Sequence, residues 1–211
     1  MEPPLNFDGA DLAVCQTVVE GFRPEVEAMT VTQFDHVLPW TEEEYLALGE
    51  TSDRVELFDG SLVVTPAPTP YHQDCSYRLS ALLYDLARTA GLGLYQAVNV
   101  RLRPGRIPIP DLVVTRPIDR SELVIEASDV LLVCEITSPS NARYDRVMKM
   151  HDYAEAGIPW YLLIDPDTAQ LLLFRLEGKR YLEHAEGKPG HPLVLTEPVA
   201  VEIDPAALGL A

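Results

Sequence analysis

Apolar residues along this chain fall into patterns that predict β-strands. Residues 94–103 alternate between apolar and polar positions, as in a strand with one buried face, whereas residues 130–136 form an apolar run typical of a strand buried on both faces. An Asp-Gly pair at residues 59–60 separates two strand-like runs and predicts a hairpin. The expected strands cover residues 54–58, 62–65, 94–103, 111–115, 130–136, 160–164, 171–176 and 180–184.

Three helices are predicted between these strands. Thr41 and Glu44 have the spacing of a capping box at the start of a helix over residues 41–49. Leucines at helical spacing predict a second helix over residues 71–90, and a third is expected over residues 141–156. The order of these elements favours an α/β fold in which a mixed β-sheet is flanked by helices.

The start of the chain differs from the rest. Residues 1–30 have no sustained apolar period, so we interpret them as an N-terminal extension and residues 31–211 as one domain. No apolar run approaches the roughly 18 residues of a membrane span, and the first residues do not have the pattern of a secretory signal. We therefore expect a cytoplasmic protein that does not insert into a membrane.

Several common functional motifs are missing from the sequence. The three cysteines, Cys15, Cys75 and Cys134, are far apart and lack the spacing of a zinc or redox site, so we interpret them as small buried hydrophobic residues. The chain has no G-x-x-x-x-G-K-[ST], G-x-G-x-x-G or G-x-S-x-G motif. ATPase, dinucleotide oxidoreductase and α/β-hydrolase functions therefore lose their strongest sequence support.

Two carboxylates stand at unusual places in the predicted sheet. Asp111 opens a strand directly after a proline, and Glu135 lies near the end of the apolar run over residues 130–136. A single residue of this kind is more often a solvated strand end, but a charge in a buried strand needs a partner, a metal or solvent. Carboxylates at corresponding ends of adjacent strands are typical ligands of Mg²⁺. Together, Asp111 and Glu135 are candidate metal ligands.

A lysine in the third predicted helix has two interpretations. Asp145 and Lys149 stand four residues apart on one helix face. They can form an exposed ion pair worth about 0.3–0.5 kcal/mol. Alternatively, Lys149 points from the helix towards a water on the metal. The spacing fits both interpretations.

Five motifs occur in order in the second half of the chain. They are IPDLVV at 109–114, VCEITSPS at 133–140, DRVMK at 145–149, YAEAGIPWY at 153–161 and IDP at 164–166, and they follow ELFDGSLV at 56–63 and PAP at 66–68. This set resembles the bacterial putative restriction endonuclease family of the PD-(D/E)XK nuclease superfamily over residues 31–181. The resemblance implies a restriction-endonuclease-like α/β core and a metal-dependent nuclease that hydrolyses phosphodiester bonds of DNA.

The resemblance also implies roles for individual residues. Asp111 matches the acidic residue of the PD element, Glu135 matches that of the (D/E)XK element, and Thr137 stands where the superfamily usually has its lysine. Lys149 fits the position of a lysine that has moved to the following helix. The implied catalytic residues are Glu56, Asp111, Glu135 and Lys149; Mg²⁺ or Mn²⁺ would be held by Asp111, Glu135, Glu56 and the carbonyl of Ile136, with His72, Thr137 and Asp145 as accessory residues.

The charge of the chain opposes DNA binding. Sixteen basic residues against 33 acidic ones give a net charge of −17, and such a field repels polyanions. Seven arginines near the predicted site favour a locally basic rim; they are Arg101, Arg103, Arg106, Arg116, Arg120, Arg143 and Arg146.

Two alternatives to an active nuclease therefore stay open. One is a catalytically silent nuclease fold that acts as a binding or regulatory module, for which acidity is no handicap. The other is an acidic surface that mimics nucleic acid and binds a basic partner.

Edge strands and the aromatic segment at residues 160–161 also predict a homo-oligomer, most simply a dimer.

Overall fold

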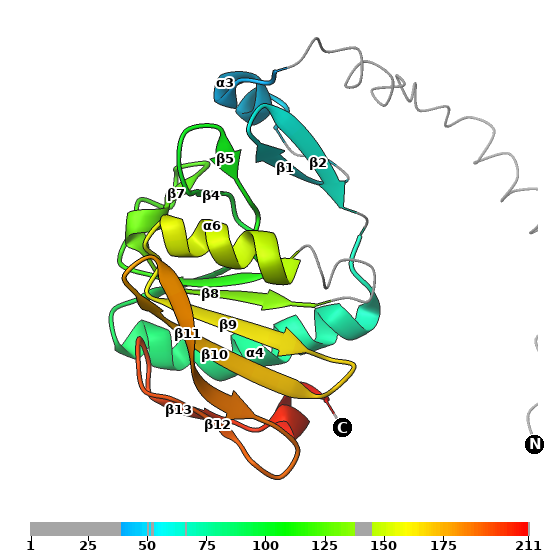
Figure 1. Ribbon diagram of the computed structural model, residues 1–211, viewed down its shortest axis with the longest axis vertical. Coiled ribbons are helices and arrows are strands. Elements are labelled where there is room, and N and C mark those ends of the chain that lie inside the picture. Colours follow the sequence, from blue (N-terminus) through cyan, green and yellow to red (C-terminus); the bar gives the residue numbers. More distant parts are fainter. Residues whose placement is uncertain (1–38, 50, 52, 66, 138–144, 211) are drawn as a thin grey trace, which may run out of the picture. The chain divides into compact units, whose positions relative to one another are not determined.

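The computed structural model describes residues 39–49, 51, 53–65, 67–137 and 145–210 (Figure 1). All of these described residues belong to one compact unit. The predicted extension over residues 1–30 lies outside the described residues, as do residues 31–38. In the described ranges, no helix is both long and apolar enough to cross a membrane.

A six-stranded sheet forms the centre of this unit. Its strand order is β11-β10-β9-β8-β6-β3. β8 and β9 pair in parallel, whereas the other neighbours pair antiparallel, so the predicted mixed sheet is confirmed. The strands are β3 (Gly93–Gln96), β6 (Leu112–Thr115), β8 (Val130–Ile136), β9 (Trp160–Asp165), β10 (Gln170–Glu177) and β11 (Arg180–Gly187).

Helices cover both faces of the sheet. Successive residues of a strand point to opposite sides, so a strand made of apolar residues presents an apolar surface on each face. The long helix α4 (Pro70–Thr89) packs its apolar stripe against one face, beside the small hairpin β12 (Leu193–Leu195) and β13 (Val201–Ile203) and the turn η3 (Pro205–Leu208). The short helix α6 (Met150–Glu155) packs against the other face through Tyr153 and Ala154 (Figure 1). The predicted flanking helices are therefore confirmed.

A smaller sheet adjoins this core. The predicted hairpin is present as β1 (Arg54–Phe58) and β2 (Ser61–Thr65), and β5 (Arg106–Ile107) pairs with the other edge of β1. Helix α3 (Glu42–Ala47) packs on it through Tyr45. The predicted capping box of α3 is also present, with reciprocal hydrogen bonds between Thr41 and Glu44.

Two predicted elements differ from those observed. The strand expected over residues 94–103 is divided into β3 and β4 (Val100–Arg101), because Ala97 adopts a left-handed backbone with φ of 50°. β4 then pairs in parallel with β7 (Ile125–Glu126), which precedes the short turn η1 (Ala127–Asp129). Residues 141–144 of the third predicted helix lie outside the described residues; from Asp145 onward it consists of a π-helical turn, η2 (Asp145–Lys149), that leads into α6.

Candidate active site

Asp111 and Glu135 lie next to each other across two strands. In the antiparallel register of β6 and β8, Leu112 is opposite Cys134, so Asp111 and Glu135 form the next cross-strand position. The amide N–H of Ile136 donates to Asp111 Oδ2 over 2.7 Å. Both carboxylate residues are buried, with exposed fractions of 5% and 3%. The structure therefore brings together the two candidate metal ligands at one end of the sheet.

A buried ammonium group bridges two glutamates at this position. Lys149 Nζ lies 3.1 Å from Glu135 Oε1 and 3.3 Å from Glu56 Oε1. Glu56 comes from β1, and its Oε1 accepts a hydrogen bond of 2.7 Å from the amide of Ile109. Lys149 is only 4% exposed, so it points into the acidic centre and not into bulk solvent. The side chain of Asp145, the other residue of the predicted ion pair, lies outside the described part of the structure.

Tyr153 is a member of the centre that the sequence did not single out. Its hydroxyl donates to Glu135 Oε1 over 2.6 Å, and the residue is fully buried. Lys149 ends the π-helical turn and Tyr153 follows four residues later on α6, so both reach the same carboxylate oxygen. The spacing of four from Lys149 was the available signal, but a tyrosine in an apolar stripe is usually a core residue.

Arg54 is the second member that sequence reasoning missed. Its Nη1 lies 2.8 Å from Asp111 Oδ1. Arg54 and Glu56 are two residues apart on β1 and therefore point to the same side of the strand, which was a usable signal. His72, from the first turn of α4, places Nε2 3.2 Å from Asp111 Oδ2. Among the described residues, Arg54 Nε and Nη2 and His72 Nδ1 are buried without a hydrogen-bond partner.

The surroundings shift the pKa values of the two central carboxyl groups in opposite directions. Burial would raise the pKa of Asp111, but the hydrogen bond from His72 and the charge of Arg54 outweigh it and hold that pKa well below its usual range. Burial raises the pKa of Glu135 to about 7, and the neighbouring Asp111 charge adds to this although Lys149 opposes it. Burial would lower the pKa of His72, but its hydrogen bond to Asp111 and the negative charges of Asp111 and Glu135 together outweigh burial, so this pKa is raised.

Ile136 and Thr137 follow Glu135 at the end of β8. Ile136 reaches Asp111 through its amide N–H, while its carbonyl was the predicted metal ligand. Thr137 is half-buried, and its amide donates to the carbonyl of Ile164 over 2.8 Å, which extends the pairing of β8 with β9. The hydrogen bonds given for both residues are thus made through the backbone.

The residues present suit a hard divalent cation. Glu56, Asp111 and Glu135 supply buried carboxylate oxygens, the ligand type that Mg²⁺ and Mn²⁺ prefer. Three carboxyl groups share one guanidinium, that of Arg54, and one ammonium, that of Lys149, so acidic groups outnumber these two basic groups in the centre. A divalent cation would offset this excess.

A second acidic group lies on α6 outside this centre. His151, Asp152 and Glu155 bring possible ligand atoms within 4.8 Å of one another. Two of the three are exposed, and Asp152 is held by the guanidinium of Arg106 over 2.5 Å. Exposed acidic groups of this kind are common on protein surfaces, and the buried centre has the better donor set.

Three arginines of the predicted basic rim pair with the chain's own carboxylates, whereas Arg116 and Arg120 are exposed. Arg101, Arg103 and Arg106 all lie in the β4–β5 segment and all form ion pairs. Their partners are Glu42 and Glu126 for Arg101, Asp59 for Arg103, and Asp59 and Asp152 for Arg106. The side chains of Arg143 and Arg146 lie outside the described residues. The described arginines of this segment therefore leave little free positive charge for DNA.

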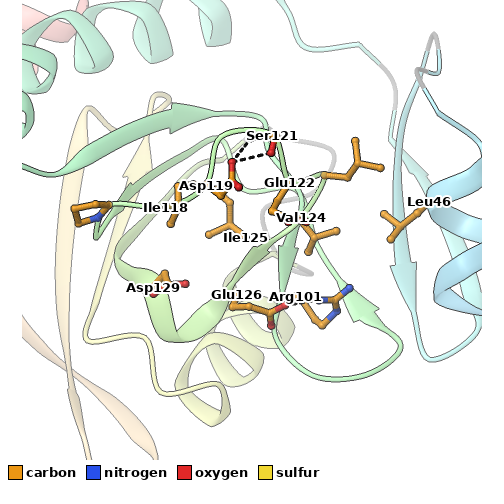
Figure 2. Close-up of a pocket in the computed structure, with 12 residues that line it drawn as sticks. Leu46, Arg101, Ile118, Asp119, Ser121, Glu122, Val124, Ile125, Glu126 and Asp129 are labelled. Atoms are coloured by element: carbon orange, nitrogen blue, oxygen red, sulfur yellow. Dashed lines mark hydrogen bonds and ion pairs between the residues drawn. The ribbon is translucent and has the colours of Figure 1, made fainter.

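A large cavity lies away from the acidic centre. It has a volume of about 520 Å³, and Figure 2 shows acidic side chains around it, with Arg101 bound to one of them. None of the predicted catalytic residues is among those that line it in the described part of the chain. Its carboxylates would repel a phosphate group; they belong to Asp119, Glu122, Glu126 and Asp129. The cavity is therefore not the candidate phosphodiester site.

Comparison with known proteins identifies the family. A solved structure described as a putative nuclease belonging to DUF820, from Anabaena variabilis ATCC 29413, matches with a TM-score of 0.63 and 16% identity over 81% of this chain and 97% of that chain, which shows a shared fold. No protein with a curated description matches significantly. The family model described as Uma2, putative restriction endonuclease, matches residues 42–207. The chain therefore belongs to the Uma2 family of putative restriction endonucleases.

Proposed function

We propose that this chain is a metal-dependent nuclease that hydrolyses phosphodiester bonds of DNA. One observation carries the proposal: two buried carboxylates, Asp111 and Glu135, are cross-strand neighbours, and the Lys149 ammonium lies 3.1 Å from Glu135. A purely structural core has no need for such a buried charged set, because desolvating charges is unfavourable. Membership of a family of putative restriction endonucleases supports the same function.

The carboxylates would hold the metal ion. Asp111 and Glu135 are the expected ligands of Mg²⁺ or Mn²⁺, with the Ile136 carbonyl, and Glu56 would bind it directly or through water. When bound, such an ion acts as a Lewis acid that polarises a phosphoryl oxygen and offsets the charge that builds up on the phosphate. The hydrogen bonds from the Ile136 amide to Asp111 and from Tyr153 to Glu135 fix the orientation of both carboxylates.

The cationic residues would act on the phosphate and the attacking water. Lys149 can orient the water by donating a hydrogen bond from Nζ while the same group stays anchored on Glu135 and Glu56. Arg54 is held by Asp111 through Nη1, and its Nε and Nη2 have no hydrogen-bond partner among the described residues. A guanidinium with two donors to spare suits the oxygens of a phosphodiester. We assign Arg54 to phosphate binding.

One observation favours the silent module as the second candidate. Asp111 already accepts hydrogen bonds or ion pairs from Arg54, His72 and the Ile136 amide, so a metal ion must compete with these groups. The net charge of −17 also favours the silent module, because it weakens DNA binding and a regulatory module needs no affinity for DNA. The two candidates share the fold and differ in whether the centre cleaves a phosphodiester.

A cleavage assay tests the proposal. Supercoiled, linear and single-stranded DNA are incubated with Mn²⁺ or Mg²⁺, or with a chelator. We expect cleavage that needs the metal and that falls at least about 100-fold in Glu135→Gln and Lys149→Met. Glu202→Gln on β13 and Lys188→Met are the matched controls, because both residues are exposed and remote in sequence from the centre. Thermal melting checks that each variant is folded.

Calorimetric titration with Mn²⁺ separates the two candidates. We expect one main binding site in the wild-type chain and loss of its heat signal in Asp111→Asn. A chain that binds Mn²⁺ through Asp111 but cleaves none of the substrates is the silent module. Cleavage that persists unchanged in Glu135→Gln would show that the proposed centre is wrong.

A further inference from the structure

The outward face of α4 has an unusual composition. The helix buries Cys75, Leu79, Leu83 and Ala87 against the sheet, and Ala81 lies at the centre of the opposite side. Residues that are three, four or seven positions from Ala81 share its face. All of them are exposed, and with Ala81 they define the α4 outer face: Asp74, Tyr77, Arg78, Ala81, Tyr84, Asp85 and Arg88.

Two large aromatic side chains stand out on this surface. Tyr77 is 70% exposed and Tyr84 is 55% exposed. Exposed aromatic residues grouped on one surface are typical of protein interfaces, in which tyrosine and arginine are enriched. The charged residues of the face contact each other within the helix: Arg78 Nε lies 2.8 Å from Asp74 Oδ2, and Arg88 Nε lies 3.5 Å from Asp85 Oδ1. They remain available for further ion pairs.

The α4 outer face is complementary to itself when two copies run antiparallel. If a two-fold axis passes beside Ala81, residues that follow Ala81 in one copy face residues that precede it in the other. Tyr84 then meets Tyr77 of the second copy, and Asp85 meets Arg78. One turn further out, Arg88 meets Asp74. Every charged residue of the face thus meets the opposite sign, and the tyrosines meet each other.

The parallel arrangement lacks this complementarity. Two parallel copies in register would place each residue beside its own equivalent, so that Asp74 faces Asp74 and Arg78 faces Arg78. Like charges that face each other destabilise a contact. The antiparallel arrangement also places the small side chain of Ala81 at the closest approach, where it allows the two helix axes to come within about 8–10 Å.

We propose that the α4 outer face binds a second copy of this chain as an antiparallel two-fold dimer. The acidic centre stays open in this dimer, because His72 lies on the buried side of α4 and nine residues, or about 14 Å, before Ala81. The interface therefore does not depend on the proposed nuclease function. It also differs from an association through sheet edges, since α4 covers a face of the sheet (Figure 1).

A cysteine at the two-fold axis gives the sharpest test. The Cα atoms of the two Ala81 residues would lie about 4–5 Å apart, which overlaps the 4.4–6.8 Å range of disulfides. In the background Cys15→Ser, the variant Ala81→Cys is expected to form a disulfide-linked species of twice 23.4 kDa under mild oxidation. Val194→Cys is the matched control: Val194 is 51% exposed on β12, away from the α4 outer face, so this variant should form no disulfide-linked species. Cys75 and Cys134 are buried and do not interfere.

Charge reversal gives an independent test of the register. Sedimentation equilibrium should show dimers of the wild-type chain, and Asp74→Arg or Arg88→Asp alone should lower the association constant at least about tenfold, a loss of about 1.4 kcal/mol. The double variant restores both pairs and should regain most of this loss. A wild-type chain that sediments as a monomer at about 100 µM would overturn the proposal. A monomer in which Tyr77→Ala weakens binding to a single-stranded oligonucleotide would assign the face to base stacking instead.

Discussion

Individual residues of the acidic centre are costly to bury and are therefore closely paired. Lys149 would be unfavourable at 4% exposure without a counter-charge, but it lies between Glu135 and Glu56. Asp111 is held by Arg54, His72 and an amide N–H, which favour its ionised form. Each charge in the centre thus depends on the presence of another, and removal of one leaves its partner unpaired.

This dependence predicts the stability of lysine variants. Lys149→Met leaves two buried glutamates without their shared cation, so the free energy of unfolding should fall by about 3 kcal/mol. The double variant Lys149→Met/Glu135→Gln removes one of the stranded charges and should recover part of that loss. Denaturant unfolding measures both values, with the exposed Lys188→Met expected to lie within about 0.5 kcal/mol of wild type. Equal stability of Lys149→Met and wild type would contradict this account.

At the scale of elements, local patterns predicted most of the fold. The hairpin at Asp59-Gly60, the capping box of α3 and the apolar run of β8 all formed as expected, because each is specified by neighbouring residues. The short pairs β4–β7 and β12–β13 were not predicted. Their pairing connects segments with little periodicity of their own and depends on the core that they join.

The centre itself was only partly predictable. Asp111 and Glu135 stood out because a charge interrupts an apolar strand, and the structure places them together with Glu56 and Lys149. Arg54 and Tyr153 gave no such contrast, since an arginine at a strand start and a tyrosine in an apolar helix stripe are ordinary. Their contribution depends on contacts 57 and 18 residues away in the chain; their local spacing from Glu56 and Lys149 indicates a shared face but does not specify these partners.

The break between β3 and β4 leads to a prediction about stability. Ala97 holds φ at 50°, and its amide donates to the carbonyl of Asp111 over 3.3 Å, so this strained residue lies beside the centre. A left-handed conformation costs a residue other than glycine about 1–2 kcal/mol. Ala97→Gly should therefore raise the free energy of unfolding by about 1 kcal/mol in denaturant titration.

The control for this variant is a glycine placed where φ is negative. Ala185→Gly, in strand β11, should lower the free energy of unfolding by about 0.5–1 kcal/mol, because glycine has more freedom to lose there. Destabilisation by both variants would mean that the left-handed turn at Ala97 is not strained.

At the scale of the whole molecule, α4 connects the features described above. Its first turn brings His72 to Asp111, its buried stripe forms much of the core, and its outer face is the proposed dimer surface. The net charge of −17 does not prevent this packing, because basic side chains form ion pairs with carboxylates inside the molecule. Arg54 and Lys149 pair with Asp111 and Glu135 in the centre, and Arg106 joins the small sheet to α6 through Asp152.

The core that α4 shares with β8 predicts how the thiols react. Cys75 and Cys134 are fully buried there, and burial raises the pKa of Cys75 to about 12 and that of Cys134 well above its ordinary value. The thiolate is the reactive form, so at about pH 8, far below both values, the two groups stay protonated as well as inaccessible.

In a Cys15→Ser variant, mass spectrometry after iodoacetamide treatment should therefore find no label on the native chain at about pH 7 to 9, and two labels after denaturation in guanidinium chloride. Because a rise in pH below the folded-state pKa forms little thiolate, the native chain should remain unlabelled across this range. An ordinary exposed thiol would instead react faster by up to about tenfold for each pH unit below its pKa of about 8.5. Labelling of the native chain with that pH dependence would show that the packing between α4 and β8 opens in solution.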